Sequence, residues 1–227
     1  MKKLVRLYIT RHGQTEHNVE YRAQGWSDSP LTASGREVAS RLGVGLREIS
    51  FDKIYSSSAK RACDTAQIVR DNMGVDLIIH TDDDLRERGL GKLEGRVLGD
   101  TAWTRAREAA ERAGKSGCID LDALDEGYQN VVPQGSQIDR PYGLEDFDEF
   151  RARLKRGLDS ICEQAADGES NVLVVSHGMA ILGMISAITG EKYAQGFIEN
   201  ASITLIENID GVYHIKRVND MGYITSN

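Results

Sequence analysis

The sequence predicts an α/β fold, a three-layer α/β/α sandwich with a mostly parallel sheet and an antiparallel edge strand. Three observations support this prediction. Short apolar runs alternate with amphipathic helical stretches along much of the chain. One run, Val172 to Val175, is apolar throughout, as expected of a strand covered on both faces. Two strand-like runs near the end of the chain are joined through Asp210-Gly211, a typical hairpin signal.

The first half of the chain supplies alternating strands and helices. Leu4 to Ile9 is expected to form the first strand. Thr32 is a good N-cap, and the apolar residues after it recur at helical spacing, so a helix is predicted from Thr32 to Ile49. The second strand is expected at 53–56, a helix at 59–72 and a third strand at 77–80.

The segment from Arg96 to Leu144 differs in character. It contains one predicted helix, 101–113, followed by Gly-, Asp-, Pro- and Gln-rich sequence without clear periodicity. We interpret it as an excursion over the active site from a single domain spanning 1–227, because it has few large apolar residues to bury. The remaining predicted elements are a long helix from Glu145 to Ala165, the strand at Val172, a helix from about Met179 to Ile188, and strands at 202–207 and 212–218.

Composition excludes several classes of protein. A net charge of −7 argues against a general nucleic-acid binder, which would carry a basic face. No stretch is long enough to span a bilayer, and Arg6 interrupts the apolar run that would be needed for a signal peptide. The three cysteines are widely spaced and odd in number, as in a reduced protein. We therefore expect a cytoplasmic protein with no nucleic-acid or membrane partner; a homo-oligomer remains open.

Two similar strings follow predicted parallel strands. Arg11-His12-Gly13 ends the first strand, and Ser176-His177-Gly178 ends the strand at Val172. Ligands of open α/β sheets bind at this edge. Two imidazoles and an arginine there would form a pocket for an anion, with one histidine free to act as a nucleophile.

Other residues supply what phosphoryl transfer requires. The transition state spreads negative charge over the phosphoryl oxygens, so positioned cations stabilise it. Arg61 lies in the first turn of the predicted helix at 59–72, and His177 lies at a helix start, where backbone N–H groups favour phosphate. Glu87 lies in a glycine-rich loop and could protonate a leaving oxygen; Glu94 in the same loop is a rival carboxylate.

These strings resemble the signatures of the histidine phosphatase superfamily, the phosphoglycerate mutase-like proteins. The resemblance spans nearly the whole chain except Arg96 to Leu144. Its blocks are Arg11 to Asn18 (RHGxTxxN), Gln24 to Thr32, Ser56 to Ala66, Leu85 to Gly95, Ser176 to Gly178 and Asn200 to Ser202.

The resemblance implies roles for particular residues. His12 would become phosphorylated, and Glu87 would be the general acid and base. Arg11, Arg61 and His177 would form the phosphate pocket, Asn18 would touch the same phosphate, and Gln24 and Gly25 would contact the substrate. No metal or organic cofactor is expected for hydrolysis. The implied protein is a phosphomonoester hydrolase acting on a small phosphorylated metabolite.

Two departures from the family pattern bear on the function. Leu93 stands where relatives often carry Trp, and Trp103-Thr104-Arg105 does not match the WRRxYxxPP segment of cofactor-dependent mutases. The second departure favours the hydrolase over a cofactor-dependent phosphoglycerate mutase. The presence of Arg11, His12, Arg61, Glu87 and His177 together argues against the other alternative, a low-turnover phospho-ligand binding protein, which needs neither nucleophile nor acid. Candidates for substrate selection are Tyr21, Arg22, Trp26, Trp103, Arg105, Arg107, Tyr128, Arg140 and Tyr142.

Overall fold

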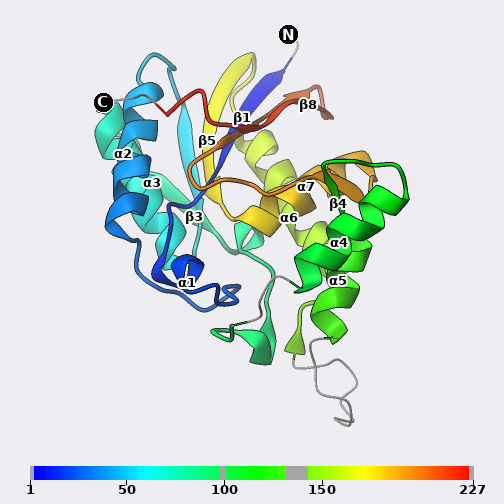
Figure 1. Cartoon of the computed structure of the whole chain (residues 1–227). Coiled ribbons are helices and arrows are strands. Elements are labelled where there is room, and N and C mark those ends of the chain that lie inside the picture. The colour runs from blue at the N-terminus through cyan, green and yellow to red at the C-terminus, as the bar shows by residue number, and fades with distance from the viewer. Residues whose placement is uncertain (1–2, 98–100, 131–142, 225–227) are drawn as a thin grey trace.

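The computed structural model describes residues 3–97, 101–130 and 143–224 and confirms the α/β fold class (Figure 1). The helices are α1 (Glu16–Val19), α2 (Ala33–Gly45), α3 (Lys60–Met73), α4 (Thr101–Arg112), α5 (Leu121–Asn130), α6 (Phe147–Gln164) and α7 (Gly178–Thr189). The strands are β1 (Leu4–Arg11), β2 (Lys53–Ser57), β3 (Ile79–Asp82), β4 (Cys118–Asp120), β5 (Glu169–Ser176), β6 (Tyr193–Gln195), β7 (Ile203–Ile209) and β8 (Val212–Asp220). Two 3-10 turns, η1 (Asp83–Leu85) and η2 (Gly91–Leu93), follow β3.

A six-stranded mixed sheet forms the middle layer, in the order β3-β2-β5-β1-β7-β8. Strands β3, β2, β5 and β1 are parallel to one another, whereas β7 runs antiparallel to β1 and β8 runs antiparallel to β7. Helices α2 and α3 pack on one face and α6 and α7 on the other (Figure 1). The registers Arg11↔Ser176 and Ser56↔Val175 bring the carboxyl ends of β1, β5 and β2 to one edge of the sheet.

Most predicted elements are confirmed, with shifted boundaries. Helix α2 begins after its N-cap Thr32 but ends at Gly45, short of Ile49, because Leu46 is already its C-cap. Strand β3 is displaced by two residues from the predicted 77–80. The β7–β8 turn has positive φ at both Asp210 (50°) and Gly211 (90°), as the hairpin signal requires.

The prediction that the segment from Arg96 to Leu144 contains a single helix was wrong. Helix α4 is present, but β4 and α5 follow it, and β4 pairs with β6. Leu121, Leu124 and Tyr128 have helical spacing, although the intervening Asp and Gly residues obscure it. Gly127 is required at the α4–α5 contact, since a Cβ there would lie 2.8 Å from the Cβ of Ala102.

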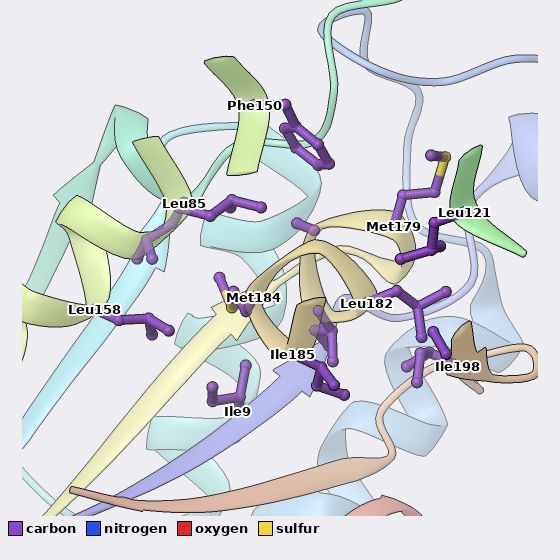
Figure 2. Close-up of a cluster of buried hydrophobic side chains, with 14 of the residues drawn as sticks. Ile9, Leu85, Leu121, Phe150, Leu158, Met179, Leu182, Met184, Ile185 and Ile198 are labelled. Carbon is purple, nitrogen blue, oxygen red and sulfur yellow. The ribbon is translucent and has the colours of Figure 1, made fainter. Parts of the chain in front are cut away.

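The excursion shares its core with the rest of the fold. Leu121, Leu124 and Ala106 belong to the same buried cluster as Leu7 and Ile9 of β1. Figure 2 shows Leu121 beside Met179 and Leu182 of α7 within this cluster. Ile119, Leu121 and Leu124 of this segment are therefore buried against the main sheet and its helices. Within the described ranges, no helix is both long and apolar enough to cross a membrane.

Arg153 of α6 fixes the loop that carries Glu87. Its guanidinium forms a bidentate ion pair with Glu145, with Nε–Oε1 at 2.5 Å and Nη2–Oε2 at 2.8 Å. The same guanidinium donates to three carbonyl oxygens of the loop, those of Asp84, Arg86 and Glu87. Because Arg153 is only 8 % exposed, this network orders the loop from within the protein.

Removing this buried cation should destabilise the protein strongly. Arg153→Met leaves Glu145 and the loop carbonyl groups without their partner, so we expect the free energy of unfolding to fall by about 3–5 kcal/mol. Urea unfolding followed by circular dichroism measures this change.

Arg156→Met is the matched control, on the same helix. Arg156 pairs with Asp84, but its side chain is 64 % exposed, so its loss should cost at most about 1 kcal/mol. Equal losses of stability in the two variants would contradict the structural role of Arg153.

Candidate active site

His12 is held in one tautomer at the end of β1. The imidazole is 3 % exposed, and its Nδ1 lies 2.8 Å from the carbonyl oxygen of Gly13. A carbonyl only accepts, so Nδ1 carries the proton of the neutral ring and Nε2 is the unprotonated nitrogen. Burial, and then the charges of Arg61 and Arg11, hold the pKa of His12 well below 6.5. The ring is therefore neutral, with Nε2 available to attack an electrophile.

Arg61 lies beside this nitrogen. Its Nε donates to His12 Nε2 at 3.3 Å, and its other donors bind the carbonyl oxygens of Gly25 and Ser27 and the carboxylate of Asp28. Burial lowers the pKa of Arg61, and Asp28 opposes this effect.

Asp28 also explains how a cation is tolerated at the start of α3. The N-cap Ala59 has no capping side chain, and Asp28 accepts instead from the backbone N–H groups of Lys60 and Arg61. The carboxylate thus offsets both the helix dipole and the guanidinium.

Arg11 and His177 also lie close to His12. Arg11 Nη1 donates to the carbonyl oxygen of Ile198 at 2.7 Å, and burial lowers the pKa of Arg11 to about 10. His177 is the N-cap of α7, with its Nε2 2.7 Å from Ser57 Oγ and its ring centroid 5.2 Å from that of His12. Burial and the charge of Arg61 hold the pKa of His177 well below 6.5.

Glu87 faces the same site from the loop after η1. Its two carboxylate oxygens accept from the backbone N–H groups of Arg88 at 2.9 Å and Met179 at 3.1 Å. Burial raises the pKa of Glu87, although these hydrogen bonds and the nearby arginines oppose the shift. A buried carboxyl group with a raised pKa is suited to donating a proton.

Glu94 has a different environment. It accepts hydrogen bonds from the N–H groups of Gly25, Trp26, Ser27 and Leu90 and from the Ser27 hydroxyl. These bonds lower its pKa, although desolvation raises it. Glu94 therefore orders the loop at 25–27, and of the two rival carboxylates only Glu87 lines the cavity beside His12.

Asn18, Gln24 and Gly25 are placed differently relative to that cavity. Asn18 lines it while its side-chain oxygen closes the capping box of α1 with Thr15. Gln24 also lines it, held between Thr15 and Ser29 by hydrogen bonds of 2.8 and 2.9 Å. Gly25 is not among the lining residues. A Cβ at this position would lie 2.1 Å from the carbonyl oxygen of Arg88, so it is required by close backbone packing.

The cavity beside His12 has a volume of about 160 Å³. Arg11, His12 and Glu87 line it, together with Arg88 and Phe197, whereas Arg61 and His177 do not line it but contact the His12 ring. Its lining is therefore cationic on one side and carries one carboxylate.

Several buried donor atoms at this site are unsatisfied. Arg11 Nε, Arg88 Nη1 and His177 Nδ1 have no hydrogen-bond partner among the described residues. Buried polar atoms normally have partners, so the unsatisfied guanidinium N–H groups of Arg11 and Arg88, which both line the cavity, point to an anionic ligand. Within the same residues, no group of three or more His, Cys, Asp or Glu side chains could hold a metal ion.

Sequence reasoning assigned no role to three of the residues that shape the site. They are Arg88, which pairs with Asp125 and lines the cavity, Arg153, which orders the Glu87 loop, and Asn200, whose Nδ2 donates to the His12 carbonyl oxygen at 2.7 Å. Arg153 carries a detectable signal, since it is a charged residue between Phe150 and Leu154 on the apolar face of α6.

Only some of the candidate residues for substrate selection line the cavity. Trp103 and Tyr128 line the cavity, whereas Trp26 packs under Arg86 and Arg22 pairs with Glu20. Arg105 is exposed and lines no cavity beside the site. Arg140 and Tyr142 lie outside the described residues.

Comparisons with known proteins agree with this geometry. The model of the histidine phosphatase superfamily (branch 1) matches residues 7–221. "Probable phosphoglycerate mutase GpmB" from Salmonella choleraesuis (strain SC-B67) is 34 % identical over 187 residues, covering 82 % of this chain and 76 % of that protein.

Solved structures show the same similarity. The crystal structure of phosphoglycerate mutase from Bacillus anthracis str. Sterne is 38 % identical with a TM-score of 0.82, covering 98 % of this chain and 96 % of that one. Mycobacterial glucosyl-3-phosphoglycerate phosphatase, at 24 % identity and a TM-score of 0.68, covers 95 % and 98 % of the two chains and shows a shared fold. The chain is a member of the histidine phosphatase superfamily, branch 1.

Proposed function

We propose that this protein is a phosphomonoester hydrolase that acts on a small phosphorylated metabolite in the cytoplasm through a phosphohistidine at His12. The observation that carries the proposal is the fixed tautomer of His12, which donates its Nδ1–H to the Gly13 carbonyl oxygen and leaves Nε2 unprotonated beside the Arg61 guanidinium. The raised pKa of Glu87 supplies the matching acid at the same cavity.

In the first step, His12 Nε2 attacks the phosphorus and the bond from phosphorus to the ester oxygen breaks. The departing oxygen takes the proton of Glu87, so the products are the alcohol and phosphohistidine. Arg11, Arg61 and His177 stabilise the charge on the phosphoryl oxygens, and the Asn18 side chain binds the same group.

In the second step, water attacks the phosphohistidine. Glu87, now ionised, accepts a proton from the water, the bond from Nε2 to phosphorus breaks, and inorganic phosphate leaves. Glu87 is then protonated again and His12 is neutral. Gln24 and Gly25 shape the substrate side of the site, Gln24 at its wall and Gly25 through its bond to Arg61.

A phosphoglycerate mutase is the second candidate, because two relatives reported above carry that name. A mutase shares the phosphohistidine but returns the phosphoryl group to its substrate. A protein that binds a phosphorylated ligand but hardly turns it over is a third candidate. Such a protein would need neither a nucleophile nor a buried acid.

Removal of the nucleophile should abolish turnover and protein phosphorylation together. In His12→Ala we expect at least about a 10³-fold loss of kcat and no acid-labile phosphate on the protein. Phosphate release and acid quenching of enzyme incubated with radiolabelled substrate measure the two effects. His214→Ala, on exposed β8, should retain both. Turnover that survived in His12→Ala would exclude the phosphohistidine.

The pH dependence should identify the acid. Attack requires neutral His12, whose pKa lies below 6.5, so kcat rises as pH increases through that pKa. Departure of the alcohol requires protonated Glu87, whose pKa lies above 4.5, so kcat falls as pH increases through the pKa of Glu87. Glu87→Gln should lower kcat by about 10²–10⁴-fold and remove the alkaline limb, measured with alkyl phosphates across the pH range.

Glu94→Gln is the control for this experiment. Glu94 orders a loop, so the variant should lose stability but keep a bell-shaped profile. An alkaline limb that persisted in Glu87→Gln would assign the proton transfer to another group.

The hydrolase and the mutase differ in their products. With 3-phosphoglycerate we expect release of inorganic phosphate and no 2-phosphoglycerate, whether or not 2,3-bisphosphoglycerate is added. Phosphorus NMR of the mixture distinguishes the two outcomes. Isomer formation without free phosphate would establish the mutase, and no turnover of any phosphoester with micromolar binding would establish the binding protein.

A further inference from the structure

A second, larger cavity adjoins the site of His12. Its volume is about 710 Å³, against about 160 Å³ for the cavity beside His12, and it lies within the usual range for small-molecule sites. Ala23, Trp103, Tyr128 and Phe197 line both cavities. We refer to the larger cavity as the apolar chamber. Because its walls continue those of the smaller cavity, a group attached to a phosphate at His12 would extend into the chamber.

Most of the chamber wall is aromatic or aliphatic. The aromatic residues are Tyr21, Trp103, Tyr128 and Phe197, and the charged residues are Arg107 and Glu111, both exposed residues of α4. Trp103 and Phe197 meet edge to face with ring centroids 6.3 Å apart, and Trp103 Nε1 donates to the Tyr128 hydroxyl at 3.2 Å. The hydrogen bond pairs the indole N–H of Trp103 with the hydroxyl of Tyr128, so both rings present apolar surface to the chamber.

The same wall exposes apolar side chains that would ordinarily be buried. Tyr21, Val97 and Phe197 are 78 %, 61 % and 54 % exposed. Tyr21 also has a φ of 54°, an uncommon backbone conformation for a bulky residue. Three exposed apolar side chains around one cavity, one of them held by a strained backbone, are typical of a ligand site.

Phe197 joins the chamber to the phosphate pocket. The guanidinium carbon of Arg11 lies 4.8 Å from the centroid of the Phe197 ring, while the same ring contacts Trp103. A substrate that contacted Phe197 in the chamber would thus lie next to the cation that faces its phosphate.

We propose that the substrate of this enzyme is a phosphate monoester whose alcohol is a large apolar group with an aromatic ring, and that this group binds in the apolar chamber. The proposal rests on the hydrolase function above. A leaving group as small as glycerate would fill little of the chamber and would leave most of its apolar wall in contact with water. An aromatic group instead buries its surface there and stacks on the rings of the wall.

The test compares alkyl phosphates whose leaving groups ionise alike. We expect kcat/KM for 2-(1-naphthyl)ethyl phosphate to exceed that for ethyl phosphate by at least about 30-fold, because the ring system removes apolar surface from water. We expect kcat/KM for 3-phosphoglycerate to lie below that for the naphthyl ester.

A variant at the chamber rim tests the location. Val97→Asp places a carboxylate against the bound ring and should lower the ratio of the two kcat/KM values about tenfold. The ratio corrects for any effect of the new charge on phosphate binding itself. Val212→Asp is the matched control, since Val212 is 58 % exposed on β8 and lines neither cavity, and its ratio should be unchanged.

The outcomes separate this proposal from the proposed function. Hydrolysis of both esters at equal kcat/KM, a ratio unaltered in Val97→Asp, or a preference for 3-phosphoglycerate would overturn the apolar substrate and leave the hydrolase intact. If no ester released phosphate, the hydrolase would fail, and calorimetry with 2-(1-naphthyl)ethylphosphonate and ethylphosphonate would then decide. Tighter binding of the naphthyl compound, lost in Val97→Asp, supports the chamber; equal affinities overturn it.

Discussion

The site depends on one constraint, namely that a buried imidazole stays neutral and in one tautomer between two guanidinium groups. The Gly13 carbonyl fixes the proton on Nδ1, and burial, followed by the charges of Arg61 and Arg11, opposes a second proton on Nε2. The features that would bind an anionic phosphoryl group thus also preserve the lone pair that would attack it. The proposed nucleophile and the cations around it are therefore physically one arrangement.

Such a concentration of buried cations needs compensation, and the fold provides it locally. Asp28 offsets Arg61, and the Arg153–Glu145 pair holds the Glu87 loop through its carbonyl groups. Glu94 accepts hydrogen bonds from the backbone N–H groups of Gly25, Trp26 and Ser27 in the adjoining loop. The carboxylates among these partners, Asp28, Glu94 and Glu145, all lie in irregular segments, so buried charge contributes to the order of these loops.

Sequence reasoning predicted the layers and the residues around His12 because both leave short-range patterns. The strands β1 and β5 are apolar runs followed directly by a histidine and a glycine, and α2, α3 and α6 keep one face apolar. The signatures around Arg61 and Glu87 are likewise contiguous. Arg153 and Asn200 were not assigned, since each acts through backbone groups far away in sequence. Strands β4 and β6 have three residues each and are specified mainly by their pairing, which no local pattern reveals.

The carboxylate that caps α3 from a distant loop has a consequence for how the molecule folds. Asp28 reaches the helix start across more than 30 residues, and the carbonyl oxygen of His12 is bound by Asn200 across 188. Contacts of such long sequence separation form late, because the chain must close large loops before they contribute. A short fragment of the chain therefore cannot form all of these contacts. Recovery of catalytic turnover therefore marks complete refolding, whereas recovery of helical signal precedes it.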